Sequence, residues 1–434
     1  MAELLDFPAP DEVAERTPAD RDRAIDVIRI ASLTGVVAGH TVMATSMIRD
    51  GVFIWDNLLT TSTAMQALTW VFQIMPLFFF AGVAASMGSW RPGISWGGWL
   101  MKRCTRLYRP VFYYLAFWAV ALLGLRRVLP IHIYEPIAGV SIQLLWFLGA
   151  YVLVLATVPL LYRITTTIRL ALGVAGIYAV VALVDVVRLH TSTAVLGYLN
   201  IVVWVIPGMF GVAYRRGLLT RAAALRIGLV MLGIDVALCR YGPYEMSLVG
   251  LEGQRLANMT PPSLLLAGHA IVLCALVIAA MPAITRWAQR PRVWWLTVIG
   301  NSGAMTLYLW HMPALLGVHL VFDYLGWYRF PGQPHLLGLS IVQLLMMAAL
   351  VGALFVVLRP LENAPLRGWD GGRVAAPGVR SAAVGVALCI ASAATLASVK
   401  WGLKDEGLCC VAVMLVGLVA ARALATAPAP REQT

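Results

Sequence analysis

Long stretches without a single charged residue recur along the chain and limit what it can fold into. Residues 30–48, 137–162, 257–284 and 293–322 contain no Asp, Glu, Lys or Arg. Each is long enough to cross a hydrocarbon core of about 30 Å as a helix. Hydrophobic residues make up 60% of the chain and charged residues 12%, about half the charged share of a typical soluble protein. We therefore expect a membrane protein, and this composition excludes a soluble cytoplasmic enzyme and a secreted disulfide scaffold.

Charged residues and Pro/Gly clusters divide the apolar sequence into about twelve spans of roughly twenty residues. The predicted spans are centred near Thr34, Phe79, Phe117, Val152, Gly176, Val205, Leu232, Ile271, Leu307, Met346, Ile390 and Leu415. Two of them are weaker, because Arg226 and Asp235 interrupt the seventh and Arg422 shortens the twelfth. The predicted fold class is all-α, a polytopic transmembrane helix bundle.

A segment rich in proline and glycine, residues 359–380, separates a ten-span core from two extra C-terminal spans. We expect a cytoplasmic acidic tail over residues 1–23, the membrane domain over 24–358, a two-span appendix over 381–424 and a tail over 425–434. The appendix is built from small residues and contains no histidine, and we expect no buried acid in it. Such a composition is typical of a packing or dimerisation surface, so a homo-oligomer is possible.

The basic residues indicate an orientation. The formal net charge is +12, and the short loops on one side of the predicted bundle carry 17 Lys and Arg against 9 on the other. Since basic loops stay in the cytoplasm, the N-terminus is expected there. The same residues form no single basic surface with interleaved aromatics, which argues against nucleic-acid binding. Only three lysines among abundant alanine and glycine suggest a bacterial chain, hence a multi-pass protein of the inner membrane.

Metal and redox chemistry have little support in the sequence. The six cysteines show no CxxC or CxxH spacing and are expected to be small apolar fillers. No HxxxH motif occurs, and His311 and His319 are eight residues apart, so we expect no metal ligands and no permanently bound cofactor. Residues 93–97 match G-x-S-x-G, but they lie in a basic loop without the strand-turn-helix context of a nucleophile elbow.

The first span holds the most informative ionisable residues. Arg29 and His40 are eleven residues apart, about three helical turns, so they share one face about 16 Å apart along the axis. Such residues inside a span usually face the bundle interior. Arg29 at the cytoplasmic boundary and His40 near the membrane centre would suit a long anionic donor, with phosphates on the arginine and the reactive end at the imidazole. The alternative is an anchoring arginine and a histidine bonded to a neighbouring span. Asp26 is expected to pair with Arg29.

A basic cluster precedes the third span. Lys102, Arg103, Arg106 and Arg109 lie within eight residues, and Arg103 and Arg106 would share a helix face. They either add phosphate-binding capacity beside Arg29 or anchor the helix as cytoplasmic cations.

Other ionisable residues inside spans have weaker signals. His311 lies mid-span two residues before Pro313, which frees backbone groups, and it either bonds a neighbouring helix or takes part in chemistry. A satisfied structural contact is expected for the rest, which show no spacing partner: Asp185, Asp235, His269 and His319.

Five segments, in order, resemble the integral-membrane acyltransferase-3 family. They are RAIDVIRIASLTGVVAGH with its Arg-x10-His, MPLFFFAGVAAS, MKRCTRLYRPVFYY with its Arg-x-x-Arg, LLWFLGAYVLVLATVPL and IGNSGAMTLYLWHMPAL. The resemblance spans about residues 21–358. It implies transfer of an acyl group, often acetyl from acetyl-CoA as co-substrate, to a hydroxyl of a glycan, glycolipid, small molecule or other membrane-associated or extracytoplasmic acceptor.

Carried over by position, the resemblance implies that His40 is the catalytic base and that Arg29, Arg103 and Arg106 bind the donor. Arg106 and Arg109 form an alternative pair, because Arg109 stands directly before Pro110 where the family pattern has two residues between its second arginine and the proline. The two spans after residue 380 exceed the ten that the family usually has.

Further substrate-binding candidates are Trp146, Tyr308 and His311. Donors to the oxyanion of the tetrahedral intermediate remain open among Trp146, Tyr308, Asn301, Ser302 and Gln73. A secondary transporter is the alternative function, since about twelve spans with a few buried charges are ordinary there.

Overall fold

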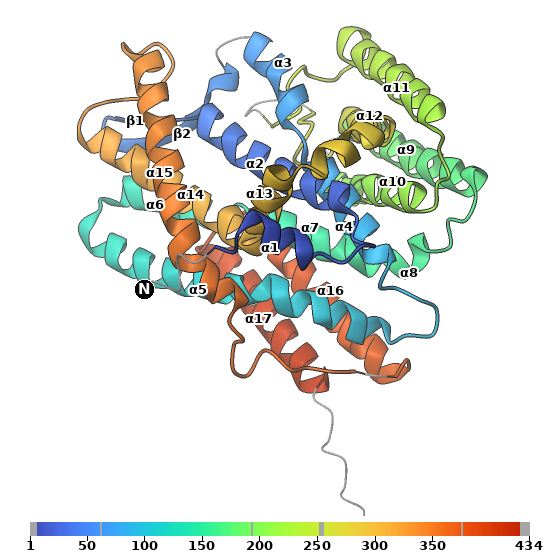
Figure 1. Ribbon diagram of the computed structural model, residues 1–434. Coiled ribbons are helices and arrows are strands. Elements are labelled where there is room, and N and C mark those ends of the chain that lie inside the picture. Colours follow the sequence, from blue (N-terminus) through green and yellow to red (C-terminus); the bar gives the residue numbers. More distant parts are fainter. Residues whose placement is uncertain (1–6, 61–62, 192–193, 251–255, 375, 426–434) are drawn as a thin grey trace, which may run out of the picture.

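The computed structural model describes residues 7–60, 63–191, 194–250, 256–374 and 376–425 as a helical bundle (Figure 1). Within these residues, 12 helical segments are long and apolar enough to cross a membrane. The all-α fold and the predicted number of spans are confirmed, including the weaker seventh and twelfth spans. The chain is a multi-pass membrane protein.

The helices carry the labels of Figure 1. Their bounds are α1 Pro10–Glu15, α2 Arg23–Met43, α3 Thr63–Phe72, α4 Met75–Met87, α5 Trp96–Val128, α6 Ile131–Val140, α7 Leu145–Ala156, α8 Val158–Leu161, α9 Thr167–His190, α10 Val205–Arg215, α11 Arg221–Tyr241, α12 Leu264–Ala288, α13 Pro291–Ser302, α14 Ala304–Tyr324, α15 Leu336–Asn363, α16 Val379–Ser398 and α17 Asp405–Ala425. Two 3-10 segments, η2 and η3, cover Leu58–Thr60 and Ala194–Trp204. Three spans combine two helical segments each, α3 with α4, α6 with α7 and η3 with α10.

One hairpin interrupts the helical pattern at the end of the first span. The apolar stretch 30–48 is not one helix, because α2 ends at Met43 and strand β1 (Ala44–Arg49) pairs antiparallel with β2 (Val52–Asn57). The connecting residues Asp50 and Gly51 both have positive φ, 53° and 77°. An Asp-Gly pair between β-branched and apolar residues favours this two-residue turn, so the signal was present in the sequence.

The predicted ninth span also differs from the structure. Residues 293–322 form two helices, since α13 ends at Ser302 and α14 begins at Ala304. Gly303 separates them, and a Cβ there would clash with the ring of Phe355 on α15. The break lets α13 pack on α1 and α2 while α14 continues across the bundle. Likewise, the stretch 257–284 becomes helical only at Leu264.

The two C-terminal spans pack against the body of the bundle rather than standing apart. Helix α16 contacts α5, α7 and α17. The Tyr108 hydroxyl on α5 lies 3.1 Å from Ser392 Oγ and 3.3 Å from Thr395 Oγ1 on α16. Gly149 on α7 lies directly against the Ser392 carbonyl, where any Cβ would overlap the α16 backbone. The small residues of this segment therefore serve close packing on α5 and α7.

Substitution of Gly149 tests this contact. Gly149→Ala should separate α7 from α16 and destabilise the protein by about 1–3 kcal/mol, as overpacking does. Thermal unfolding in detergent measures the change. Gly176→Ala is the matched control on α9, because a Cβ there meets no atom within 4 Å. Equal melting temperatures for the two variants would contradict the contact.

Candidate functional site

The face of α2 that carries Arg29 and His40 points into the bundle. Both residues lie on one uninterrupted helix. The exposed residues Ala31 and Thr34 are about 200° and 140° around the helix from Arg29, so they mark the opposite side. His40 and Arg29 nevertheless remain only half-buried. An inward face that keeps accessible surface is where a ligand can reach a buried side chain.

His40 contacts His311 across the interface between α2 and α14. His40 Nδ1 lies 2.9 Å from His311 Nε2, and His311 Nδ1 lies 3.0 Å from the Leu307 carbonyl oxygen. Both nitrogens of His311 are thus engaged by the protein, and its side chain is fully buried. His40 Nε2 has no hydrogen-bond partner among the described residues, so it is the nitrogen available for chemistry.

Arg29 is held by a single side-chain contact. Its Nε donates to Asn301 Oδ1 at 3.1 Å, and Asn301 in turn donates to the carbonyl oxygens of Asp26 and Thr297. Neither Nη group of Arg29 has a hydrogen-bond partner in the part of the chain that the structure describes. The predicted pair of Asp26 with Arg29 is wrong: Asp26 accepts two hydrogen bonds, of 2.6 and 3.0 Å, from Arg21. The Arg29 guanidinium thereby keeps four N–H donors for an anion.

The carboxylate of Glu362, near Arg29, already accepts hydrogen bonds from the protein. Glu362 accepts hydrogen bonds from the backbone N–H groups of Met305 and Thr306, at 3.2 and 2.8 Å, and from the Thr306 hydroxyl at 2.8 Å. It lies within electrostatic range of Arg29 but caps the N-terminus of α14. No spacing rule predicts this cap, because it joins residues more than fifty positions apart.

Arg103 on α5 lies near the same site. Tyr151 on α7 is within electrostatic range of both Arg29 and Arg103. The Arg103 guanidinium stacks over the Trp99 ring, 3.6 Å from its centroid, and donates to Ser89 Oγ and to the Trp99 carbonyl. These contacts fix its direction without neutralising its charge.

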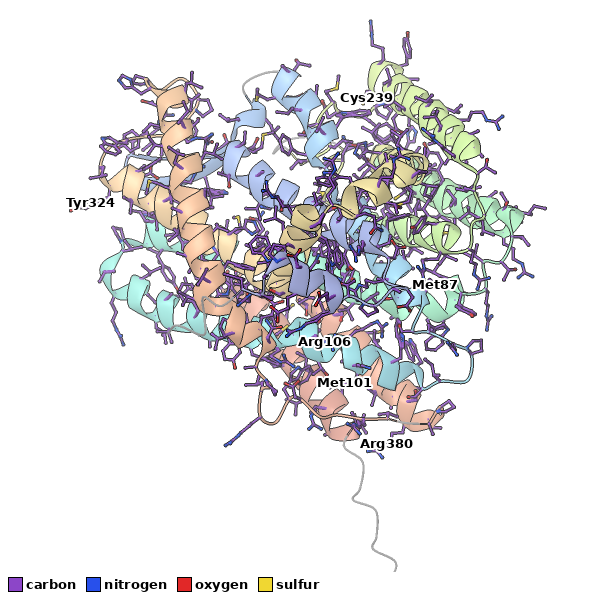
Figure 2. All side chains as sticks on the ribbon, viewed as in Figure 1. Met87, Met101, Arg106, Cys239, Tyr324 and Arg380 are labelled. Carbon is purple, nitrogen blue, oxygen red and sulfur yellow. The ribbon has the colours of Figure 1, made fainter. Side chains whose placement is uncertain are left out.

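Arg106 and Arg109 differ in their surroundings. Arg106 is exposed on α5 (Figure 2), and no hydrogen bond or ion pair is found for it among the described residues. Arg109 is buried, forms an ion pair through Nη2 and Nε with Asp370, and donates to the Glu362 carbonyl at 2.9 Å. A guanidinium with these partners holds the 359–380 segment against α5. Arg109 is thus engaged by the protein, whereas Arg106 is exposed and Arg103 is held by Ser86, Ser89 and Trp99.

Aromatic side chains from α7, η3 and α14 pack together into an aromatic wall. Trp146 packs against Trp204 and Phe147, with ring centroids 5.5 and 6.0 Å apart. Tyr308 packs on Phe147, and its hydroxyl donates to the Leu144 carbonyl.

Most of the expected oxyanion donors are occupied. The Tyr308 hydroxyl, the Asn301 amide, the Ser302 hydroxyl and the Gln73 amide all donate to other protein atoms. Among the residues described, only the Trp146 indole N–H in that set is left without an acceptor.

A second polar group lies farther along α14. Ser46 on β1 bonds His319 Nδ1 at 2.8 Å and Asp323 Oδ2 at 2.7 Å, and all three side chains are buried. His319 and Asp323 are four residues apart and share a helix face, so the expectation that His319 has no spacing partner was wrong. Asp185 also has a spacing partner, because it forms an ion pair with Arg188 three residues later at 3.0 Å.

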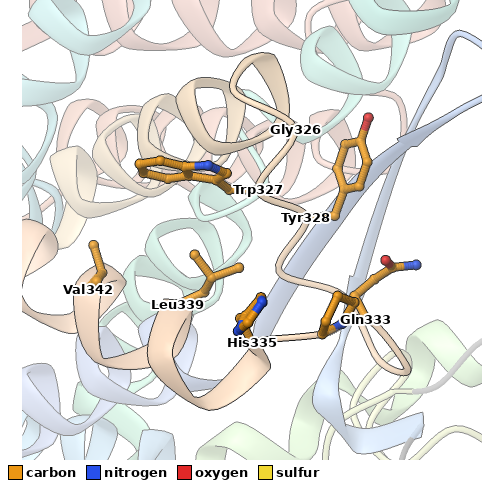
Figure 3. Close-up of a pocket in the computed structure, with 8 residues that line it drawn as sticks. Gly326, Trp327, Tyr328, Gln333, His335, Leu339 and Val342 are labelled. Atoms are coloured by element: carbon orange, nitrogen blue, oxygen red, sulfur yellow. The ribbon is translucent and has the colours of Figure 1, made fainter.

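A surface cavity lies at the end of α14. It follows α14 and is lined by Trp327, Tyr328, Gln333, His335, Leu339 and Val342 (Figure 3). Neither His40 nor His311 is among the residues that line this cavity. Among the described residues, no group of three His, Cys, Asp or Glu side chains is placed to hold a metal ion.

Comparison with known proteins identifies the family. A family model described as an acyltransferase domain matches residues 22–359. The chain belongs to the acyltransferase-3 family. No curated protein and no solved structure matches it. In this membrane acyltransferase the matched range runs from α2 into α15 and contains Arg29, His40, Arg103, Arg106, Arg109 and His311, while α16 and α17 lie outside it.

The different roles of Arg106 and Arg109 can be separated by stability. Arg109→Ala leaves the partly buried Asp370 carboxylate without its cation and should destabilise the acyltransferase by about 2 kcal/mol. Arg106→Ala removes an exposed side chain and should change stability by less than about 0.5 kcal/mol. Melting temperatures in detergent compare the variants, and a larger loss for Arg106→Ala would contradict these roles.

Proposed function

We propose that the protein transfers an acyl group from acyl-CoA to an acceptor hydroxyl, with His40 as the general base. One observation carries the proposal. The inward face of α2 presents an arginine with unpaired Nη donors and an imidazole with an unpaired Nε2, about 16 Å apart. This separation suits a long donor whose phosphates bind the cation while its thioester reaches the base. The family membership supports the reaction class.

The chemistry follows from the position of His40. The acceptor hydroxyl gives its proton to Nε2 as its oxygen attacks the thioester carbonyl carbon. The tetrahedral intermediate collapses, the C–S bond breaks, and the imidazolium returns the proton to the leaving CoA thiolate. The Trp146 N–H is the donor we assign to the oxyanion, because the other candidates are engaged.

The donor is bound by cations from two helices. Arg29 supplies both Nη groups, Arg106 supplies an exposed guanidinium, and Arg103 completes the positive charge around Tyr151. The excess of basic residues in the loops on this side, 17 against 9, supports a cytoplasmic location for it, where acyl-CoA is found. The protein would then lie in the inner membrane of a bacterium with a cytoplasmic N-terminus.

The substrates are proposed by chemical class. An acetyl group is the acyl unit that the family resemblance implies. The acceptor is a hydroxyl compound such as a glycan, a glycolipid or a small molecule. It would approach His40 from the outer half of the bundle, since the arginines occupy the other end. Trp146 and Tyr308 belong to the wall beside this path.

Acetyl-CoA turnover by the purified protein in nanodiscs tests the proposal. His40→Gln should retain acetyl-CoA binding but lower kcat by about 10²- to 10⁴-fold, the usual contribution of a general base. Arg29→Ala should raise the KM for acetyl-CoA by about ten-fold or more, because it removes charge-assisted hydrogen bonds. CoA release, detected with a thiol reagent, is the readout.

The controls are an exposed histidine and an exposed arginine elsewhere, His132→Gln and Arg226→Ala. Both should behave as the unaltered protein does. Full turnover by His40→Gln would overturn the assignment of the base. If the unaltered protein neither binds acetyl-CoA nor releases CoA but moves a solute across a liposome membrane, the transporter alternative replaces this function.

A further inference from the structure

We infer that His311 is a positioning residue that holds His40 in the one tautomer with a bare Nε2. The inference rests on the proposed function, in which His40 is the base. A neutral imidazole carries its hydrogen on either nitrogen, and only the form with the hydrogen on Nδ1 can accept a proton at Nε2. The neighbours of Nδ1 therefore decide whether His40 is ready to react.

The two imidazole rings meet edge to edge. Their planes are 21° apart and their centroids 5.2 Å apart, while the two nitrogens are 2.9 Å apart. The difference between these two distances is about twice the distance from an imidazole centroid to its own nitrogen. Both nitrogens therefore point along the line that joins the rings, which is the geometry of an in-plane N–H···N hydrogen bond rather than of face-to-face stacking.

The direction of that hydrogen bond follows from the Leu307 carbonyl. A carbonyl oxygen only accepts, so His311 Nδ1, 3.0 Å away, carries a hydrogen. In the neutral ring, His311 Nε2 is then a lone pair and accepts from His40 Nδ1–H. This leaves the lone pair of His40 at Nε2.

The opposite direction would require a charged His311. A cationic ring would donate from both nitrogens and force the hydrogen of His40 onto Nε2, which would abolish the base. His311 is fully buried, and no carboxylate bonds either imidazole among the residues described. An unpaired cation in such a place is strongly disfavoured. The stable arrangement is therefore a chain of two hydrogen bonds between neutral groups, from His40 to His311 and from His311 to the Leu307 carbonyl.

Helix α14, which carries His311 and Leu307, is anchored at its N-terminus. Leu307 and His311 lie on successive turns of α14, whose first turn is capped by Glu362 through Met305 and Thr306. The carbonyl that fixes His311 thus belongs to a helix anchored a few residues earlier.

Nitrogen NMR on protein labelled with ¹⁵N-histidine tests the tautomer directly. His40 should show a protonated Nδ1 and an unprotonated Nε2, with its signals assigned by their loss in His40→Gln. In His311→Leu the two forms should mix, because Nδ1 loses its acceptor. A protonated Nε2 in the unaltered protein, or an unchanged tautomer in His311→Leu, overturns the inference.

Kinetics with two replacements separate positioning from packing. His311→Gln keeps a carbonyl acceptor near the former Nε2 and should retain most of kcat, whereas His311→Leu should lose about ten-fold or more with an unchanged KM for acetyl-CoA. His319→Leu is the matched control, a buried histidine on the same helix with no contact to His40, and its kcat should stay within about two-fold of the unaltered value.

Equal losses in His311→Gln and His311→Leu would overturn the positioning role. A failure of the proposed function is recognised separately. The unaltered protein would then release no CoA, while the NMR spectrum would still report which nitrogen of His40 is protonated.

Discussion

A polar side chain buried in a membrane bundle is stabilised by a hydrogen bond or ion pair with another segment, because little water is available to it there. In this protein such partnerships mark the contacts that matter most. His40 on α2 meets His311 on α14, and Arg109 on α5 meets Asp370 beyond α15. Because breaking either contact would strand a polar group, these pairs fix the helices relative to one another as well as orienting side chains.

Other polar contacts hold α2 at both ends and α14 at its start. Asn301 holds the Arg29 end of α2, while Arg329 donates to the carbonyls of Val42 and Ala44 where α2 ends. Burial lowers the pKa of Arg329 to about 10, yet it stays a cation near neutral pH and stabilises that helix C-terminus. Glu362 holds the start of α14. The His40–His311 distance is thus set by contacts at the helix ends.

Local sequence signals predicted the parts of the site that lie on one helix. The eleven-residue spacing of Arg29 and His40 was sufficient to place both on one face, and α2 is uninterrupted between them. The number of spans followed from hydropathy. The apolar run 30–48 predicts helix beyond the end of α2, where the structure has strand β1. The local signal for the β1–β2 hairpin is the Asp50-Gly51 pair.

Contacts between helices could not be derived in the same way, because they join residues that no spacing rule connects. His40 and His311 are 271 positions apart, and either could have bonded another span. Helix spacing would allow Asp26 to pair with Arg29. In the structure Asp26 instead accepts hydrogen bonds from Arg21, which lies before the helix. Similarly, Arg103, Arg106 and Arg109 look equivalent in the sequence. Only the structure distinguishes them, because Arg109 forms an ion pair with Asp370 while Arg106 is exposed. In a membrane bundle, periodicity thus predicts which face of a helix turns inward, but the partner it meets there depends on the packing of the whole chain.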